Sequence, residues 1–292
     1  MLQAMIVRAI GGFYDVRTAD GSVFHCRARG RFKNDGIIPA VGDRVTFTQL
    51  SDTEGILERV GARDSFILRP PVANLDQVVI ICATQDPPIS LQLLDRLLVL
   101  VENHRLRAVI CLNKDDLPRT DNEHFLQSLY AGIGYTLLVT SAKELRGIDK
   151  LQQELCGRIS VLAGLSGVGK STLLNRIQPG LALRTGEVSE KMRTGKHTTR
   201  HVELLTLDCG GMVADTPGFS QLDLTNVKSD ELRLCFPEFA APAAHCRFTT
   251  CKHVNEPGCA VKDAVATGTV ASSRYNNYLT FLEEVTTQER SY

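Results

Sequence analysis

A glycine-rich stretch carries the clearest chemical signal of the chain: Gly164, Leu165, Ser166, Gly167, Val168, Gly169, Lys170 and Ser171, followed by Thr172. Its spacing is G-x-x-x-x-G-K-S, and it stands between an apolar strand-like run (160–163) and a helix-like segment (171–177). In that context, successive backbone N–H groups and a helix amino terminus surround phosphate oxygens. We expect Lys170 to reach the β- and γ-phosphates of a nucleotide and the Ser171 hydroxyl to bind Mg²⁺.

A second motif, Asp215-Thr216-Pro217-Gly218, closes the apolar run 211–214 about fifty residues later and fits D-x-x-G. Asp215 would hold the Mg²⁺ ion through water, and the N–H of Gly218 would contact the γ-phosphate. The tetrapeptide alone is weak evidence. Paired with the glycine-rich loop, it predicts the second half of a nucleoside triphosphate site.

The base is indicated by Asn113, Lys114, Asp115 and Asp116, which follow the strand-like run 108–112 and fit N-K-x-D. Guanine offers N–H donors at N1 and at the 2-amino group, and one carboxylate, that of Asp116, can accept from both. Ser141, Ala142 and Lys143 end the next strand-like run. A backbone N–H there, at Ala142, suits guanine O6. These two segments favour guanine over adenine.

Together these motifs resemble the translation-factor-like GTPases, but in a circularly permuted order. Here the base-reading segments (113–116 and 141–143) precede the phosphate loop (164–171). The sheet and its strand-end loops can keep their places while the chain is cut and rejoined elsewhere. The permutation also places the segment after Gly218 directly before the carboxyl-terminal region.

The resemblance also implies a switch segment before the strand-like run 202–207. A threonine there would bind Mg²⁺ and the γ-phosphate, and we favour Thr199 over Thr198 because it precedes an arginine, as in similar GTPases. Phe219 stands where many GTPases carry the glutamine that orients water. His197 is the candidate replacement, because a neutral imidazole can orient or deprotonate water; an ordinary surface histidine is the alternative.

Near the carboxyl terminus, three thiols and one imidazole are spaced as a metal site: Cys246, Cys251, His253 and Cys259. Such a set fills a tetrahedral Zn²⁺ shell and leaves no position for water, which predicts a structural ion. His245 and Cys235 are possible substitutes. The other six cysteines (Cys26, Cys82, Cys111, Cys156, Cys209, Cys235) are predicted to be inert core thiols, because nine cysteines without an export signal argue against a disulfide framework.

Basic residues alternate with apolar ones near the amino terminus: His25, Arg27, Arg29, Arg31 and Lys33. Side chains two apart share a strand face, so the pattern predicts one buried side and one cationic side. Such a face suits RNA, in which aromatic rings stack on bases and arginines contact phosphates. An ordinary solvated face is the alternative.

The elements that must position these residues divide the 292-residue chain into three parts. Residues 1–68 contain short β-like runs and predict a small all-β barrel or sandwich. In 69–220, strands alternate with helices, which predicts a mostly parallel sheet with helices on both faces. Residues 221–292 read as a small helical domain around the metal cluster. The net charge is zero and no run could span a membrane, so we expect a cytoplasmic protein that binds nucleic acid only through local patches.

The barrel-like start, the permuted motifs and the C-x₄-C-x-H-x₅-C tail closely resemble the ribosome small-subunit-dependent GTPase family, RsgA, over nearly the whole chain. The resemblance implies an OB-like barrel that binds RNA, a monomer that binds the small ribosomal subunit and its rRNA, and GTP hydrolysis that the subunit stimulates before release. Two alternatives stay open: a permuted GTPase that acts on another RNA or on the large subunit, and an RNA-binding scaffold with a vestigial nucleotide site.

Overall fold

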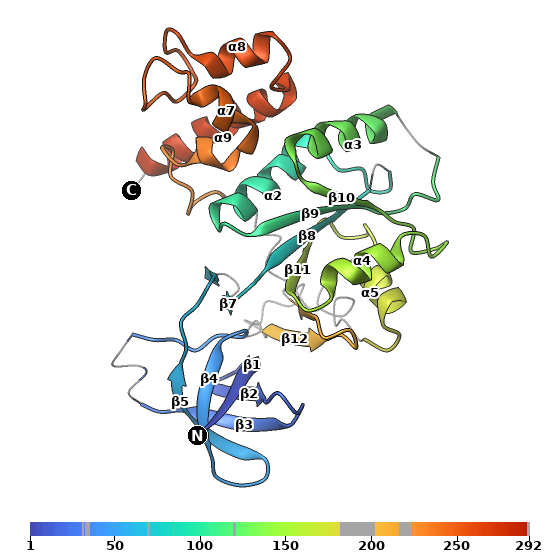
Figure 1. Cartoon of the computed structure of the whole chain (residues 1–292), viewed down its shortest axis with the longest axis vertical. Helices are drawn as coiled ribbons and strands as arrows, with labels where there is room; N and C mark the ends of the chain where they lie inside the picture. The colour runs from blue at the N-terminus through green and yellow to red at the C-terminus, as the bar shows by residue number, and fades with distance from the viewer. Residues whose placement is uncertain are drawn as a thin grey trace, which may run out of the picture.

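The computed structural model describes residues 1–30, 32, 36–68, 71–83, 85–118, 121–181, 202–215 and 223–290. Figure 1 shows three parts along its long axis: a barrel at the amino-terminal end, a central sheet flanked by helices, and a helical unit at the carboxyl-terminal end. No helix among the described residues is both long and apolar enough to cross a bilayer.

Five strands form the barrel: β1 (Leu2–Ile10), β2 (Phe13–Arg17), β3 (Val23–Ala28), β4 (Arg44–Gln49) and β5 (Glu54–Val60). They pair in the order β1-β2-β3-β5-β4, and β4 pairs back onto β1, which closes the barrel. Along β3, Phe24 and Cys26 are buried whereas His25 and Arg27 are exposed, so the predicted alternation is confirmed within the strand. Arg31 and Lys33 lie outside the described residues.

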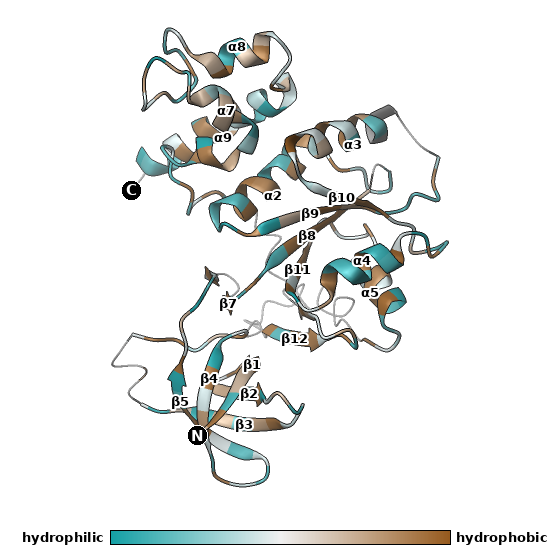
Figure 2. Ribbon diagram, in the orientation of Figure 1, coloured by the Kyte–Doolittle hydropathy of each residue, from teal (hydrophilic) through white to brown (hydrophobic). Residues whose placement is uncertain are grey.

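The central sheet contains β8 (Gln77–Cys82), β9 (Arg107–Leu112), β10 (Thr136–Val139), β11 (Ile159–Ala163), β12 (Val202–Thr206) and β13 (Met212–Asp215). Its order is β10-β9-β8-β11-β13-β12, parallel except for the antiparallel β12. Every residue of β8 is buried, as a strand covered on both faces requires. Figure 2 shows this centre as hydrophobic. A short hairpin, β6 (Phe66–Leu68) with β7 (Pro71–Ala73), leads into the sheet.

Helices cover both faces of the sheet, as predicted. Helices α2 (Leu91–Asn103) and α3 (Asp121–Ile133) pack on one face, and α4 (Ile148–Leu155) and α5 (Lys170–Ile177) on the other. Side chains that alternate along β8 divide accordingly: Ile80 belongs to the core under α2 and Ile81 to the core under α5. Ser90 caps α2, because its hydroxyl accepts from the N–H of Leu93.

The barrel and the central sheet form one continuous hydrogen-bonded surface. Strand β1 pairs with β12 in antiparallel register, with Arg8 opposite Glu203 and Ala9 opposite Val202. A side-chain bond supports the junction, since Arg17 Nη1 donates to Thr206 Oγ1 at 2.6 Å. The barrel is therefore attached to the strand that follows the segment predicted to be the switch.

The carboxyl-terminal unit contains η3 (Leu232–Cys235), η4 (Pro237–Phe239), α7 (Ala240–Ala243), α8 (Ala260–Ala266) and α9 (Ser272–Arg290). It docks on α2 through a buried network in which Arg274 Nη1 donates to Asp95 Oδ1 at 2.6 Å, and both side chains are fully buried. Tyr130 and Asn277 also donate to the Asp95 carboxylate, each at 2.6 Å. Asp95 is therefore surrounded by donors from α3 and α9.

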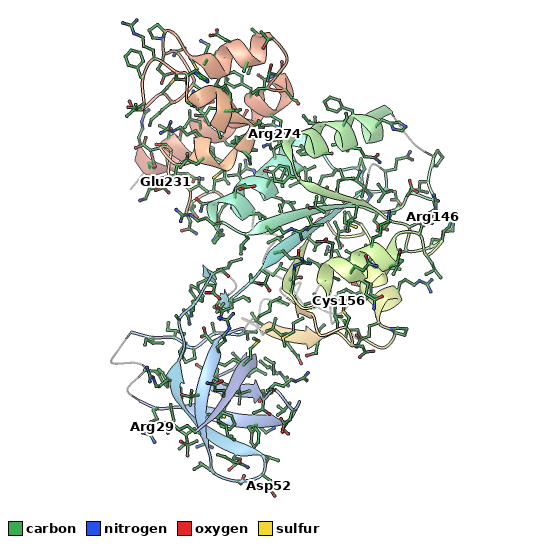
Figure 3. The ribbon with its side chains drawn as sticks, in the orientation of Figure 1. Arg29, Asp52, Arg146, Cys156, Glu231 and Arg274 are labelled. Atoms are coloured by element: carbon green, nitrogen blue, oxygen red, sulfur yellow. A yellow bond between two sulfur atoms is a disulfide. The ribbon has the colours of Figure 1, made fainter. Side chains whose placement is uncertain are left out.

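One prediction about the cysteines is wrong. Cys156, which Figure 3 labels, and Cys209 are half-buried and form a disulfide. They lie in the turns that precede β11 and β13, and these strands are parallel neighbours, so the two turns come together. Cys26, Cys82, Cys111 and Cys235 are buried free thiols, as predicted. Burial raises the pKa of Cys26 to about 11 and that of Cys111 to about 12, which keeps them protonated and unreactive.

Candidate nucleotide site and metal centre

The glycine-rich loop joins β11 to α5 at the carboxyl end of the sheet, which is the end where ligands bind in open α/β sheets. Three of its glycines have positive φ: Gly164, Gly167 and Gly169. Two have no room for a side chain, because a Cβ at Gly164 would lie 2.0 Å from the Ile81 carbonyl oxygen and one at Gly169 would lie 2.4 Å from Asn113 Nδ2. The loop is therefore packed tightly against the two neighbouring strand ends.

Lys170 is the first residue of α5, and its side chain folds back over the loop. Its Nζ donates to the carbonyl oxygens of Gly164 at 2.9 Å and Leu165 at 2.7 Å. Burial lowers the pKa of the ammonium, and no carboxylate among the described side chains offsets this effect. Lys170 is a partly desolvated cation held at the centre of the loop, where an anion would be stabilised.

Asn113 brings three separate loops together at the end of β9. Its Nδ2 donates to the Val168 carbonyl oxygen at 2.8 Å, in the glycine-rich loop. Its Oδ1 accepts from Thr140 Oγ1 at 3.1 Å and from the Ala142 N–H at 3.3 Å, in the loop after β10. Asn113 is 5% exposed, so these bonds are shielded from water. The sequence-predicted phosphate and base segments are therefore adjacent.

Asp116 is directed at the loop after β10. Its Oδ1 accepts from Ser141 Oγ at 2.6 Å, and Lys143 Nζ lies 3.8 Å from Oδ2. The Ser141 hydroxyl lowers the pKa of the Asp116 carboxyl, so it is ionised at neutral pH and can accept two N–H donors. Arg176 of α5 holds the same loop from behind, through a bond from Nε to the Ala142 carbonyl oxygen at 3.1 Å.

Some neighbours of this site were not anticipated from the sequence. Lys114 Nζ donates to the carbonyl oxygen of Asp86, in the loop after β8, and Arg146 pairs with Asp115. The position of Asp86 could have indicated its role, because the loop after β8 begins at the same edge of the sheet as the loops that carry the other motifs. For Arg146, the sequence contained no motif.

Several predicted residues cannot be placed. Asp215 ends β13, beside β11, but its side chain is not among those described. Thr198, Thr199, His197 and Gly218 lie outside the described residues. Ser171 and Thr172 follow Lys170 in the first turn of α5.

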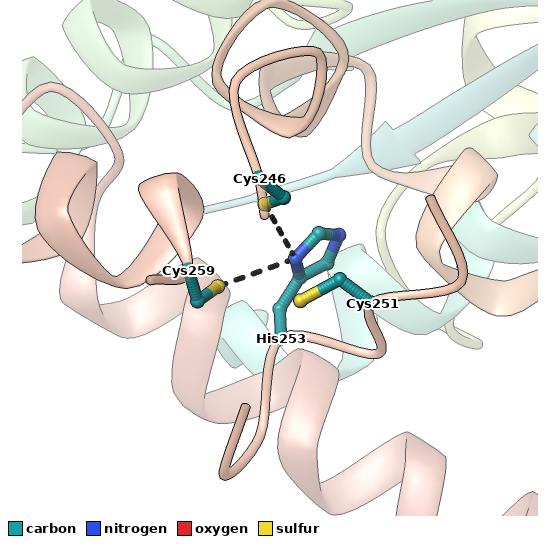
Figure 4. Close-up of side chains that lie close together, drawn as sticks. All are labelled: Cys246, Cys251, His253 and Cys259. Carbon is teal, nitrogen blue, oxygen red and sulfur yellow. Dashed lines mark hydrogen bonds between the residues drawn. The ribbon is translucent and has the colours of Figure 1, made fainter. Parts of the chain in front are cut away.

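Four metal-ligating side chains meet in the loop between α7 and α8, as Figure 4 shows. The ligand atoms of Cys246, Cys251, His253 and Cys259 all lie within 4.8 Å of one another. His253 Nδ1 faces the sulfurs of Cys246 and Cys259 at 3.6 and 3.4 Å. Three soft sulfur ligands and one nitrogen at this separation fit a tetrahedral Zn²⁺ ion. Cys235 and His245 do not belong to this cluster.

The metal-ligand loop is fixed from below by α9. Tyr275 Oη donates to the His253 carbonyl oxygen at 2.6 Å, and Tyr278 Oη donates to that of Lys252 at 2.5 Å. The Glu256 carboxylate accepts from the N–H groups of Lys252 and Val254, both at 2.8 Å. The four ligands are therefore held together by bonds outside the cluster.

The basic residues of the barrel form a mixed face, not a purely cationic one. His25 Nδ1 lies 2.6 Å from Asp15 Oδ1, and Arg29 lies 2.8 Å from Glu58. Arg27 instead lies over the Phe13 ring, 5.0 Å from its centroid, and Phe13 is 51% exposed. Sequence reasoning missed the acidic partners because they come from β2 and β5.

Comparisons with known proteins agree with this geometry. A family model described as RsgA GTPase matches residues 60–225, and one described as RsgA N-terminal domain matches residues 3–57. A curated relative from Moorella thermoacetica, named small ribosomal subunit biogenesis GTPase RsgA, is 48% identical, and the match covers all of both chains. One of the same name from a Geobacillus species is 44% identical, again over all of both chains.

Two solved structures have the same fold. A crystal structure of YjeQ from Thermotoga maritima has a TM-score of 0.87 at 38% identity and covers 98% of each chain. The structure of YloQ, described as a circularly permuted GTPase, has a TM-score of 0.84 at 36% identity and covers 99% of this chain and 96% of that one. The fold predicted from the permuted motifs is therefore confirmed.

Proposed function

The chain belongs to the RsgA GTPase family and is a GTP hydrolase, and from this premise we propose that it binds the small (30S) ribosomal subunit and assists its late maturation. Hydrolysis is slow in the free protein, is stimulated by the subunit and leads to release. The observation that carries the proposal is the position of Asn113, which hydrogen-bonds to both the phosphate loop and the loop after β10.

Guanine is selected by the carboxylate of Asp116, which accepts from N1–H and the 2-amino group, and by the N–H of Ala142, which exchanges its bond to Asn113 for one to O6. Ser141 supports this choice, because its hydroxyl keeps Asp116 ionised and aimed at the loop after β10. Asn113, Lys114, Asp115 and Lys143 complete this side of the site. Adenine would leave Asp116 without a donor.

The phosphates bind in the loop 164–169, where Lys170 exchanges its bonds to two carbonyl oxygens for phosphate oxygens. Ser171, Thr199 and Asp215 hold a Mg²⁺ ion. Their side chains supply oxygen atoms, which are the ligands that this hard cation prefers. When bound, Mg²⁺ neutralises charge that develops on the phosphate oxygens. His197 orients the attacking water, and the Gly218 N–H contacts the γ-phosphate.

The cluster of Cys246, Cys251, His253 and Cys259 binds one structural Zn²⁺ ion. The protein is monomeric and cytoplasmic and contacts rRNA through its barrel, where His25, Arg27, Arg29, Arg31 and Lys33 provide the basic face. Arg27 and Phe13 support this role most directly, because an exposed ring under a guanidinium offers a base a stacking surface. The three proposed domains are 1–68, 69–220 and 221–292.

The test is GTP hydrolysis by the full-length protein, measured alone, with small subunits and with large subunits. We expect stimulation by small subunits only. Lys170→Ala should abolish the stimulated rate, whereas Lys262→Ala, which removes an exposed cation from α8, should leave it unchanged. Equal stimulation by both subunits would contradict the assignment to the small subunit, and Lys170→Ala with the parental rate would contradict the proposed phosphate site.

A further inference from the structure

One arginine outside the recognised motifs joins the two base-reading loops. Arg146 Nη1 donates to Asp115 Oδ2 at 2.6 Å, and its Nη2 donates to the Asp115 carbonyl oxygen at 3.1 Å. Nη2 also donates to Glu144 Oε2 at 2.6 Å. The guanidinium therefore holds both the side chain and the main chain of a single residue in the loop after β9. Figure 3 labels Arg146 at the edge of the central sheet.

Asp115 is well placed to transmit this restraint. Its side chain is only 6% exposed, and its N–H donates to the Thr140 carbonyl oxygen at 3.1 Å. The motif N-K-x-D places no requirement on this position, so Asp115 contributes to the guanine side of the site by holding the loop in place and not through its carboxylate. Its neighbour Asp116 is the proposed guanine acceptor. Whatever fixes Asp115 also fixes where the Asp116 carboxylate can point.

Arg146 is in turn anchored to the loop that carries Ser141 and Ala142. The Ser141 N–H donates to the Arg146 carbonyl oxygen at 3.0 Å, which closes the turn 141–146. The Ser141 hydroxyl accepts from the Glu144 N–H at 3.0 Å and donates to Asp116 at 2.6 Å. The turn is therefore a compact unit, and Arg146 and Ser141 attach it to the loop 113–116 together with the Ala142 N–H and Lys143.

We propose that Arg146 is a positioning residue for guanine selection. It keeps the loops 113–116 and 141–146 in register, so that the Asp116 carboxylate and the Ala142 N–H face one base. This inference rests on the proposed guanine site. Because the Arg146 side chain is 50% exposed, water screens part of the ion pair, and the expected effect is moderate.

Inosine provides a readout that a merely structural residue would not change, because hypoxanthine lacks only the 2-amino group of guanine. An Asp116 carboxylate that accepts from both N1–H and the amine needs a defined orientation, whereas a single bond to N1–H tolerates some rotation. Loss of Arg146 should therefore weaken the binding of GDP more than the binding of IDP. General loosening of the fold would weaken both equally.

The experiment measures binding of GDP, IDP and ADP to the full-length parent, Arg146→Ala, Asp115→Asn and the double variant. We expect Arg146→Ala to lower the affinity for GDP about tenfold and the affinity for IDP about twofold, in line with the loss of a charge-assisted pair. The double variant should bind GDP as Arg146→Ala does, because both changes break one contact. Arg158→Ala is the matched control: this half-exposed arginine pairs with Glu154 near the opposite end of β11 and should leave every affinity within twofold.

The inference fails if Arg146→Ala binds GDP within twofold of the parent, if GDP and IDP weaken equally, or if the two single effects add fully. Should Arg146→Ala not fold, Arg146→Lys keeps the charge but loses the two-pronged geometry. It should then reduce the preference for GDP over IDP, and an unchanged preference would overturn the inference. A parent that binds ADP as tightly as GDP would instead reject the guanine site itself and this inference with it.

Discussion

At the scale of single residues, the site is organised by side chains that bond to more than one loop. The motifs identified Asn113 and Lys170 from the sequence, because each has a fixed spacing from glycines or acids nearby. The partner Arg146 could not be predicted, since its bonds to Asp115 join segments about thirty residues apart and follow no local pattern, whereas Asp86 could have been suspected only from its place after β8. The sequence motifs therefore predict the residues of the site, whereas the contacts that orient these residues depend on how the strands pair in the sheet.

Lys170 gives a prediction for pH. Burial lowers its pKa, and only the ammonium form attracts phosphate, so GDP affinity should fall as the pH rises, and the fall should begin below the ordinary lysine pKa of about 10.4. Lys170→Arg should remove this alkaline loss, because a guanidinium stays charged there. The measurement is the GDP dissociation constant against pH for both proteins. Parallel profiles would exclude Lys170 as the titrating group.

At the scale of elements, alternation and motif spacing predicted β3, the parallel sheet and its flanking helices. The strand β2 was not singled out, although it shows the same alternation, with Tyr14 and Val16 buried. The disulfide could not be read from any local pattern. Cys156 and Cys209 are separated by 53 residues and become neighbours only because β11 and β13 pair.

The loop between α7 and α8 gives a prediction for metal removal. A chelator should unfold the carboxyl-terminal unit, because the three thiols and His253 then lose the metal ion that they share. GDP affinity should stay within about twofold, since the guanine and phosphate loops lie at the carboxyl ends of the sheet strands and not in this unit. Elemental analysis and circular dichroism provide the measurements.

Cys235→Ala is the control for this experiment. It removes a buried thiol from the same core but not from the metal cluster, so zinc should remain at one ion per chain with a stability loss of about 1 kcal/mol. His253→Ala should lose the zinc. A parent protein purified without zinc, or a His253→Ala variant that retains a full equivalent, would refute the assignment.

At the scale of the whole molecule, the three parts are joined by contacts between distant segments. The β1–β12 pairing attaches the barrel, and the bond between Arg274 and Asp95 attaches the carboxyl-terminal unit to α2. Neither contact could be predicted from the sequence, because no local pattern indicates which segment will pair with a strand edge or with a single buried charge. Burial raises the pKa of Asp95, which opposes its charge, and Arg274 acts in the other direction.

Arg274 gives a prediction for stability. Arg274→Met should lower the free energy of unfolding by about 3–5 kcal/mol at neutral pH, because it leaves the buried Asp95 carboxylate and the nearly buried Glu238 carboxylate without their shared cation. The loss should shrink as the pH falls, since protonation of Asp95 removes the uncompensated charge. Denaturant unfolding at several pH values measures both effects.

The double change Asp95→Asn with Arg274→Met tests the electrostatic cause. It removes the charges of Asp95 and Arg274 but leaves the Glu238 carboxylate without its partner, so it should recover only part of the stability that Arg274→Met loses at neutral pH and should depend less on pH than Arg274→Met does. If Arg274→Met and the double variant are equally unstable at every pH, lost packing of the Arg274 side chain over Phe236 explains the effect instead of charge.

The β1–β12 pairing also affects how the protein is made. Synthesis proceeds from the amino terminus, so the barrel can close through β4 while β12 has not yet been translated. The edge of β1 around Arg8 then stays open until Glu203 emerges, roughly 7 to 30 s later at ordinary elongation rates. The nascent chain therefore carries an unpaired β-edge, open to wrong partners, for most of its time on the translating ribosome.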